Sequence, residues 1–477
     1  MTSRETYETV IGLEIHAELS TKTKIFCSCP NRFGEKPNTL CCPICLGLPG
    51  AMPSLNRRAV ELTVLAGLAL HCEISPISRM DRKQYFYPDL PKGYQVSQAE
   101  YPICKNGYLD ITVDGEGRRI RIQRIHLEED AGKLIHTDSE TLVDYNRSGV
   151  PLIEIVSEAD LRSGKEAAAY MRELRAVLRD AGISDCKMQE GSMRCDVNLS
   201  VRRCGETALG ERTEIKNLNS FAFAEKAIAY EGQRQIGLLE RGESVARETR
   251  RYDASRGITE VMREKEREQD YRFQPEPDVP PFSLSEEFIE SLRRTLPEPR
   301  DEKRARIIGQ YQLTEGEAQI LLSDSALLSY FEHTAKETEY PGIALNLILT
   351  ELLRLQTGEI FSTSVSEQTL GELATLAGKG EINRTMAKTL LLRLANGEEG
   401  SPIEIANREG LLQIHDERMI NTWIDEVLSE QDRAVRDYLG GKTNAIRALQ
   451  GGVMAKSRGR ANPALAERLL KAALDRL

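Results

Sequence analysis

Apolar and polar residues alternate strictly over residues 13–19, which predicts a β-strand with one apolar and one polar face. Side chains on a strand point to opposite faces with a period of two, so Glu14, His16 and Glu18 share the polar face. An acidic strand face beside a histidine is suited to metal or phosphate chemistry. A solvated sheet face fits the same alternation.

Polar residues recur within later apolar segments. Residues 192–201 alternate throughout, and residues 213–217 repeat the pattern over a shorter length. Acidic residues also interrupt apolar runs at residues 125–130 and 152–156. A buried, unpaired carboxylate is costly, so such groups usually find a cation, a hydrogen-bond donor or a proton. The recurrence favours one sheet whose polar face forms a magnesium and phosphate-transfer centre.

Helical periodicity occurs at residues 59–70 and at residues 166–181, the second closed by a glycine. Short alternating segments lie between them. The pairs Asn-Gly at residues 106–107 and Asp-Gly at residues 114–115 predict tight turns between strands. The first part of the chain is therefore expected to mix strands with helices.

A proline-rich segment at residues 274–281 interrupts this pattern and predicts a domain boundary. Beyond it the spacing is helical, with a capping box at residues 314–317 and apolar helical spacing over residues 387–394. Glycines and a proline near residue 400 mark a second break. The sequence thus predicts the α+β class, with a mixed domain followed by helical ones.

Length and charge narrow the class of protein. The 477 residues suffice for two to four domains, and the net charge of −10 gives no bulk basic character. No N-terminal segment resembles a signal peptide and no apolar run is long enough to span a bilayer, so we expect a cytoplasmic protein without a membrane partner. Residues 441–466 carry five basic and no acidic residues, which suits either a phosphate backbone or a solvated helix face.

Cysteine usage points to a metal. All ten cysteines lie in the first 204 residues, a distribution unlike uniform disulfide stapling. Cys27 and Cys29 are followed by Cys42 and Cys45, two close pairs that match structural zinc spacing. Four packed, reduced thiols are the alternative, and Cys41 is a second possible ligand in place of Cys42.

Cations and aromatic residues interleave over residues 79–94. Such a segment can hold phosphates and stack on a base, although a solvated loop with an aromatic anchor fits equally. The chain has neither a G-x4-G-K-[ST] loop nor a G-x-G-x-x-G turn after a strand. The absence of both motifs argues against ordinary P-loop and Rossmann nucleotide sites.

Long motifs occur in six segments, at residues 8–16, 81–89, 126–133, 149–158, 216–220 and 455–463. In these residues the chain resembles the B-subunit family of the bacterial aspartyl/glutamyl-tRNA amidotransferases. The resemblance implies a cradle-like catalytic domain of mixed sheet and helices, an all-helical domain, and a small helical tail domain that contacts tRNA. The expected bounds are residues 1–292, 293–405 and 406–477.

The resemblance also implies a reaction. Such subunits use ATP and Mg²⁺ to phosphorylate the side-chain carboxylate of Glu-tRNA(Gln) or Asp-tRNA(Asn). Ammonia released from glutamine by a partner amidase (A) subunit displaces the phosphate, and a small C subunit joins the two larger ones. A glutamyl- or aspartyl-tRNA synthetase is a further implied partner. A non-catalytic tRNA-binding scaffold is the rival interpretation, but it leaves the acidic strands without a purpose.

Carried over residue by residue, the family's magnesium ligands match His16, Glu129 and Glu154, with Glu14 and Glu128 adjacent. These residues are the expected catalytic centre, since metal ions neutralise charge during phosphoryl transfer.

Further site residues are expected from the same resemblance. Lys92 matches a lysine near the mouth of the ammonia tunnel. No motif identifies the ATP-binding residues, so Arg82, Lys83 and Arg194 are candidates only by charge. The four paired cysteines match the zinc-bearing branch of the family, in which zinc supports the fold.

Overall fold

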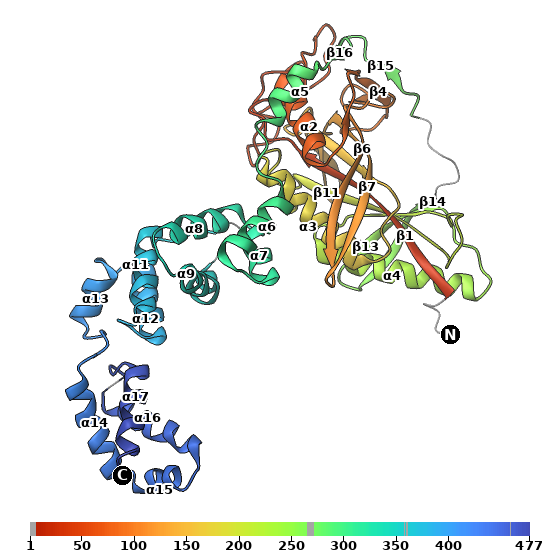
Figure 1. The fold of residues 1–477 in the computed structure, drawn as a ribbon. Helices are drawn as coiled ribbons and strands as arrows, with labels where there is room; N and C mark the ends of the chain where they lie inside the picture. The colour runs from red at the N-terminus through yellow and green to blue at the C-terminus, as the bar shows by residue number, and fades with distance from the viewer. Residues whose placement is uncertain (1–5, 265–270, 357, 359–360, 458) are drawn as a thin grey trace. The chain divides into compact units, whose positions relative to one another are not determined.

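The computed structural model describes residues 6–477 except residues 265–270, 357, 359–360 and 458. Its chain forms two compact units, Met1–Pro299 and Arg300–Leu477 (Figure 1). The first unit contains a large mixed sheet with helices, and the second is helical. The predicted α+β class is confirmed.

The first unit is built on a nine-stranded sheet of order β14-β13-β12-β11-β1-β10-β7-β6-β2. Its strands are β1 (Tyr7–Glu18), β2 (Glu73–Ile74), β6 (Cys104–Val113), β7 (Glu116–Glu129), β10 (Pro151–Ser157), β11 (Met193–Arg203), β12 (Thr213–Lys216), β13 (Glu248–Asp253) and β14 (Ile258–Glu264). All neighbours pair antiparallel except β12 and β13, which are parallel. The long strand β1 lies in the middle of the sheet.

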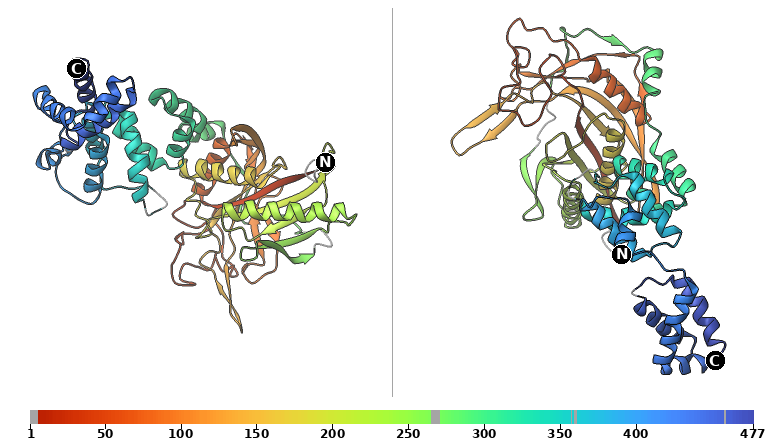
Figure 2. Two further views of the ribbon diagram at one scale, coloured as in Figure 1. Left: turned by 90° about the horizontal axis from the view of Figure 1, so that it is seen from below. Right: turned by 90° about the vertical axis from the view of Figure 1, so that its left-hand side faces the viewer.

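Helices α3 (Gly164–Asp180) and α4 (Phe221–Glu240) pack on each other and on this sheet. Helix α3 contacts β6, and α4 contacts β11 and β14 (Figure 2). Each helix begins at a serine, Ser163 or Ser220, whose side chain accepts a backbone N–H of the first turn. The apolar face of β1 is fully buried, whereas its acidic positions stay partly accessible. The predicted alternation therefore separates a buried core face from a partly accessible polar face.

Smaller elements complete the first unit. They are α2 (Arg57–Ala69), α5 (Glu286–Arg293), and the short strands β3 (Ile77–Ser78), β4 (Asp81–Gln84), β5 (Tyr94–Ser97), β8 (Lys133–His136), β9 (Thr141–Asp144), β15 (Gln274–Pro275) and β16 (Phe282–Ser283). β15 pairs with β4, and β16 pairs with β3. The proline-rich segment predicted as a boundary thus lies within the first unit, because strands at and beside it pair with earlier strands.

One of the two predicted turns is wrong. Asp114 and Gly115 form the turn between β6 and β7 with positive φ angles of 51° and 89°, as expected for an Asp-Gly hairpin. Asn106 and Gly107 instead lie inside β6, where Asn106 has φ 54° and the pairing with β7 skips a residue. Asparagine tolerates the left-handed conformation, so it fits a local distortion inside a strand as well as a turn, and the register is the same on both sides of it.

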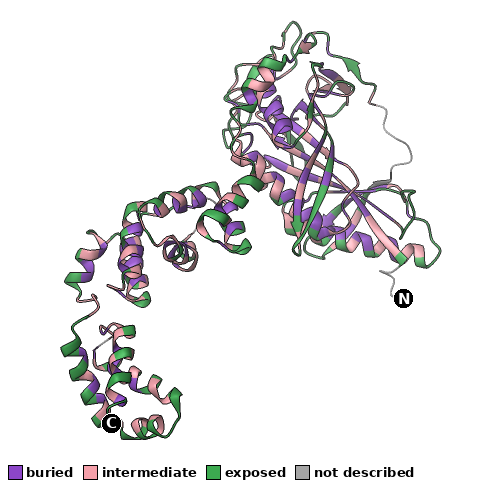
Figure 3. Cartoon of the chain, in the orientation of Figure 1, coloured by how far each residue is buried: buried purple, intermediate pink, exposed green. Residues whose placement is uncertain are grey.

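The second unit contains two separate hydrophobic cores. The first is formed by α6 (Arg300–Tyr311), α7 (Glu315–Leu322), α8 (Ser325–Lys336), α9 (Pro341–Leu347), the π-helix η1 (Ile348–Leu352), α10 (Leu353–Leu355), α11 (Glu367–Gly378), α12 (Arg384–Ala395) and α13 (Pro402–Arg408). The second is formed by α14 (Glu417–Glu430), α15 (Asp432–Leu439), the 3-10 turn η2 (Thr443–Ala445), α16 (Ile446–Lys456) and α17 (Pro463–Leu474). Buried and exposed positions alternate along these helices (Figure 3).

Local sequence signals account for several of these helices. The predicted capping box at Thr314 and Glu317 is confirmed at the start of α7, and Ser401 with Glu404 forms another in α13. Among the described residues, no helix has both the length and the apolar composition needed to cross a membrane.

Candidate active site and cysteine cluster

Strand register brings the polar residues of β1 beside those of its two neighbours. His16 lies opposite Glu154 of β10 on one side and opposite Arg194 of β11 on the other. Glu14 lies opposite Asp196 of β11. Residues directly opposite each other in an antiparallel pair share a face of the sheet. The polar face predicted from one strand therefore continues across three.

A histidine–carboxylate group lies on this face. His16 Nε2 is 3.3 Å from Glu128 Oε1 and 3.2 Å from Glu154 Oε2. His126 of β7 lies opposite Glu154, and its Nε2 is 3.5 Å from Glu128 Oε2. The ligand atoms of His16, Glu128 and Glu154 all lie within 4.8 Å of one another, a spacing that suits a metal ion.

Electrostatics within the group are strongly coupled. Burial alone would lower the pKa of His16, but hydrogen bonds with Glu128 and Glu154 raise it to about 10. Burial alone would raise the pKa of Glu154, but His126 and His16 lower it to about 2. The same two histidines hold the pKa of Glu128 well below its usual range despite burial. The carboxylates thus remain ionised and attract a cation, either a proton on His16 or a metal ion.

A second acidic group lies on the same face. The carboxylates of Glu14, Asp196 and Glu214 also lie within 4.8 Å of one another. Lys216 Nζ is 2.6 Å from Asp196 Oδ2 and 2.9 Å from Glu214 Oε1, and Asn198 Nδ2 donates to Glu14 Oε1 at 2.8 Å. Burial, followed by repulsion from Glu154, raises the pKa of Glu14. The lysine neutralises only part of the acidic charge of this group.

Both groups border one pocket of about 500 Å³. Its wall adds basic side chains and two aromatic rings from elsewhere in the first unit: Lys83, Arg124, Arg212, Tyr271 and Phe273. The Lys83 ammonium lies 4.7 Å from the centre of the Tyr271 ring. Acidic ligands beside cations and aromatic faces can bind a metal ion, a polyphosphate and a base together.

Glu129 lies apart from this pocket. It is 2% exposed, and both its carboxylate oxygens accept hydrogen bonds from Lys92 Nζ, at 2.5 and 2.6 Å. The backbone N–H of Val96 also donates to it, at 2.8 Å. Neighbours on a strand face opposite sides, so β7 directs Glu128 toward His16 and Glu129 toward Lys92. The structure does not bring Glu129 to His16 and Glu154; Glu128 occupies that place.

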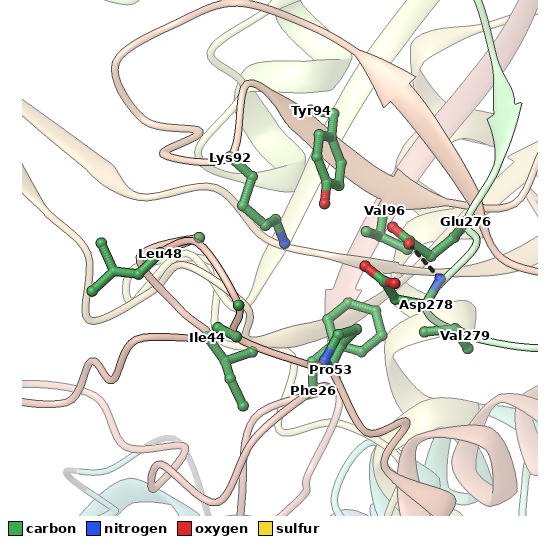
Figure 4. Close-up of a pocket in the computed structure, with 13 residues that line it drawn as sticks. Phe26, Ile44, Leu48, Pro53, Lys92, Tyr94, Val96, Glu276, Asp278 and Val279 are labelled. Carbon is green, nitrogen blue, oxygen red and sulfur yellow. Dashed lines mark hydrogen bonds between the residues drawn. The ribbon is translucent and has the colours of Figure 1, made fainter.

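The Lys92 side chain borders a second, smaller cavity of about 220 Å³. Figure 4 shows Lys92, Tyr94 and Asp278 pointing toward its interior. Residues of the segment 44–53 form another wall of it. The cavity is thus built from loops and the short strand β5, unlike the larger pocket on the sheet.

The three candidate ATP-binding cations are not brought together. Arg82 forms a double hydrogen bond with Glu276, each contact 2.8 Å, and stacks 4.3 Å from the centre of the Tyr94 ring, beside the smaller cavity. Lys83 lines the larger pocket. Arg194 Nη2 donates to Asp130 at 2.7 Å. Of the three, only Lys83 faces the space that the acidic groups border.

The four paired cysteines converge as zinc spacing requires. The Sγ atoms of Cys27, Cys29, Cys42 and Cys45 lie within 4.8 Å of one another. Two of the separations, Cys27 to Cys45 and Cys42 to Cys45, are 3.5 and 3.8 Å. Zn–S bonds of about 2.3 Å in a tetrahedron place sulfur atoms roughly 3.8 Å apart. Cys41 lies outside the group, where its thiol donates to Asn38 O at 3.3 Å.

A buried lysine supports the cysteine cluster. Lys24 is fully buried, its Nζ donates to Ser148 O at 2.7 Å and to Tyr145 O at 3.2 Å, and it lies 3.6 Å from Cys45 Sγ. A buried ammonium beside a thiol favours the thiolate that a metal requires. A hydrogen bond from Cys27, with Lys24 contributing further, lowers the pKa of Cys45 to about 4.

Sequence reasoning missed three of these features. His126 lies in an alternating run and could have been found from it, since it shares a face with Glu128. Lys24 and the pairing of Lys92 with Glu129 left no local signal, because their partners are distant in the chain.

Comparison with known families settles the relationship. Residues 9–290 match the model of the GatB/GatE catalytic domain, and residues 329–474 match that of the GatB domain. The chain belongs to the GatB family. The resemblance predicted from the six motifs is confirmed.

Members of the GatB family resemble the chain over nearly its whole length. The B subunit of the aspartyl/glutamyl-tRNA(Asn/Gln) amidotransferase of Caldicellulosiruptor saccharolyticus is 48% identical over 480 residues, which cover 99% of this chain and 100% of the relative. The protein of the same name from Thermodesulfovibrio yellowstonii is 49% identical over 469 residues, covering 97% and 98%. Both acidic groups and the cysteine cluster lie within the segment that matches the catalytic-domain model.

Proposed function

We propose that this chain is the B subunit of a tRNA-dependent amidotransferase and that its larger pocket activates the substrate carboxylate with ATP. The substrates are Glu-tRNA(Gln), Asp-tRNA(Asn) or both, and the products are the corresponding Gln- and Asn-tRNAs. Family membership and the names of near-full-length relatives support the complex and its ligase reaction. The pocket assignment is carried by one observation: two metal-suited acidic groups border a space that basic side chains also face.

The residues present fit a divalent cation. We place Mg²⁺ at His16, Glu128 and Glu154, with Glu14, Asp196 and Glu214 as a second acidic group facing the nucleotide. When bound, the metal neutralises phosphate charge during transfer to the carboxylate. One imidazole and carboxylate oxygens form an acceptable, mostly hard ligand set for Mg²⁺. Glu129, expected from the family as a ligand, becomes a neighbour of the site whose own partner is Lys92.

The remaining pocket residues handle the nucleotide. Lys83, Arg124 and Arg212 offer positive charge to the phosphates of ATP, and Tyr271 and Phe273 offer faces on which a base can stack. Each of these side chains acts by binding and orienting. Such positioning accounts for most of the rate enhancement in phosphoryl transfer, since the protein forms few covalent bonds in it.

We assign Lys92 and Glu129 to the ammonia step. Ammonia attacks an acyl phosphate through its nitrogen lone pair, so it must be oriented as it arrives. Lys92, which lines the smaller cavity, can position the ammonia, and the buried carboxylate of Glu129 holds Lys92 in place through two hydrogen bonds. This role needs ammonia from a partner amidase subunit, with a small C subunit completing the complex.

The other parts of the chain receive supporting roles. We assign the cysteine cluster to structural zinc, because a four-thiolate shell leaves no open coordination position. We assign the predicted region of residues 1–292 to catalysis and that of residues 406–477 to tRNA contact. The helical region of residues 293–405 connects the two. A glutamyl- or aspartyl-tRNA synthetase is proposed as an additional partner.

Amidation by a reconstituted complex tests the proposed function. The chain is combined with its amidase and C subunits and supplied with ATP, Mg²⁺, glutamine and each misacylated tRNA in turn. We expect formation of Gln-tRNA, Asn-tRNA or both, and tRNA-dependent ATP hydrolysis that Glu154→Gln abolishes without loss of tRNA binding. Full turnover in this variant would exclude the proposed metal site, and tRNA binding without any ATP hydrolysis would favour the scaffold interpretation.

A further inference from the structure

A buried charge network lies between helix α4 and strands β12, β13 and β14. Its centre is Glu231 of α4, which is fully buried. Arg234 Nη2 donates to Glu231 Oε1 at 2.6 Å, and Gln235 Nε2 donates to the same oxygen at 2.9 Å. Thr259 of β14 donates to the other carboxylate oxygen at 2.7 Å. None of these residues takes part in the reaction proposed above.

Arg250 of β13 extends the network across the strands. Its Nε donates to Thr259 Oγ1 at 2.9 Å and its Nη2 to Thr259 O at 2.8 Å. Its Nη1 donates to Glu248 Oε1 at 2.5 Å, and Arg234 Nη2 reaches the same carboxylate at 3.1 Å. Two arginines therefore balance two glutamates. Removing one member leaves a buried charge without its partner, which is strongly unfavourable.

Two contacts connect this network to the larger pocket. Gln235 Nε2 donates to Thr213 Oγ1 at 3.1 Å, and the next residue, Glu214, lines the pocket. Thr249, whose two neighbours in β13 belong to the network, donates from Oγ1 to Glu214 Oε2 at 3.2 Å. Because side chains alternate along a strand, β12 and β13 present network residues to α4 and pocket residues to the opposite face.

Strand β12 needs such support because it is short. It has four residues, and its parallel pairing with β13 joins only three residue pairs. A shift of about 1 Å at a catalytic centre is enough to lower its rate a hundredfold. Side-chain contacts from the helix side therefore add to the hold that Lys216 and the neighbouring strands have on Glu214.

We propose that Glu231 is a positioning residue of the larger pocket: through its contacts with α4, β13 and β14 it fixes the strand that presents Glu214 to the nucleotide. This inference rests on the proposed function of that pocket. It extends the site to a helix that does not line the pocket.

Nucleotide affinity of the reconstituted complex tests the proposal. Glu231→Gln is compared with Glu166→Gln, a matched change of a buried carboxylate on α3, which accepts the Arg162 N–H at 2.7 Å and lies outside the pocket lining. We expect Glu231→Gln to raise the Kd of a fluorescent ATP analogue about tenfold, as outer-shell changes do, and Glu166→Gln to leave it unchanged. Equal affinities in both variants and the native complex would overturn the positioning role.

A double variant separates positioning from general destabilisation. If Glu231 acts through Glu214, the pair Glu231→Gln/Glu214→Gln binds nucleotide no more weakly than Glu214→Gln alone. Multiplicative losses would instead show an independent, structural contribution and overturn the inference. Native nucleotide binding and native ATP hydrolysis in Glu214→Gln would remove the pocket from the reaction, which refutes the proposed function itself.

Thr249→Val keeps the test decisive should Glu231→Gln fail to fold. Valine has nearly the shape of threonine but cannot donate to Glu214, and the helix-side network stays intact. We expect the KM for ATP to rise about threefold, the size of one lost hydrogen bond, with the melting temperature little changed. An unchanged KM in folded Thr249→Val would refute the coupling of β13 to Glu214.

Discussion

The larger pocket and the smaller cavity of the first unit differ in how their charged side chains are paired. The larger pocket rests on the sheet, and its carboxylates Glu128 and Glu154 share the proton of His16, which a metal ion can displace. The smaller cavity is built from loops, and Lys92, which lines it, is already paired with the buried carboxylate of Glu129. A partner that can be exchanged leaves Glu128 and Glu154 able to bind a cation. The ion pair of Lys92 and Glu129 instead keeps the Lys92 ammonium in one position. The adjacent residues Glu128 and Glu129 thus have different partners, and we propose different roles for them.

The largest effect on activity is expected when Glu128 and Glu129 are each replaced by glutamine in separate variants. Glu128→Gln removes a proposed metal ligand, so tRNA-dependent ATP hydrolysis should fall about a hundredfold or more. Glu129→Gln removes a residue outside the pocket, so hydrolysis should fall far less while amidation is lost. Steady-state ATP hydrolysis and tRNA amidation by the reconstituted complex measure both. Equal losses of ATP hydrolysis in the two variants would indicate that Glu129 also acts at the metal site, and would contradict separate roles for the two cavities.

The second effect concerns the fixed pair. Lys92→Met leaves Glu129 buried without its cation, which should cost about 3 kcal/mol of unfolding free energy. The double variant Lys92→Met/Glu129→Gln removes both charges and should recover most of that loss. Urea denaturation of the purified chain gives the values. A double variant as unstable as Lys92→Met would mean that Lys92 stabilises the cavity by packing alone.

A third prediction concerns the part of the chain outside both cavities. Deleting residues 406–477 removes the end of α13 and the helices α14 to α17, which have their own core, so the catalytic unit should stay folded. The basic segment is lost with it, and tRNA affinity should fall about tenfold at moderate salt. Filter binding at two salt concentrations measures this, and ATP hydrolysis at saturating tRNA serves as the control. Unchanged affinity would argue against a tRNA contact in this region.

The smallest effect on catalysis is expected from the cysteine cluster. Cys27→Ser should reduce bound zinc to less than about 0.2 atoms per chain, with a loss of stability on the scale of a few kcal/mol. Because the cluster supports the fold and supplies no reacting group, ATP hydrolysis at low temperature should stay within about twofold of the native rate. Cys41→Ser is the matched control, since its thiol lies outside the group. Native zinc content in Cys27→Ser would count against the four-cysteine assignment.

Particular elements show how far sequence patterns reach. The alternation in β1, the helices α2 and α3 and the capping box of α7 follow from contacts within a few residues, and each is predictable. The turn predicted at Asn106-Gly107 is wrong because a left-handed residue suits both a turn and a local distortion within a strand, and only the partner strand decides between them.

The sequence by itself determined the periodicity of the main elements, the polar face of β1 and a cysteine spacing suited to zinc. Through six long motifs it also determined the family. Only the tertiary structure decided that Glu128 joins His16 and Glu154, that Glu129 pairs with Lys92, and that Gln235 of the buried charge network contacts β12 at Thr213. The reason is physical. Periodicity and capping are local, whereas strand register and buried charge pairing depend on segments that are distant in the chain and meet only when the sheet and its helices have packed.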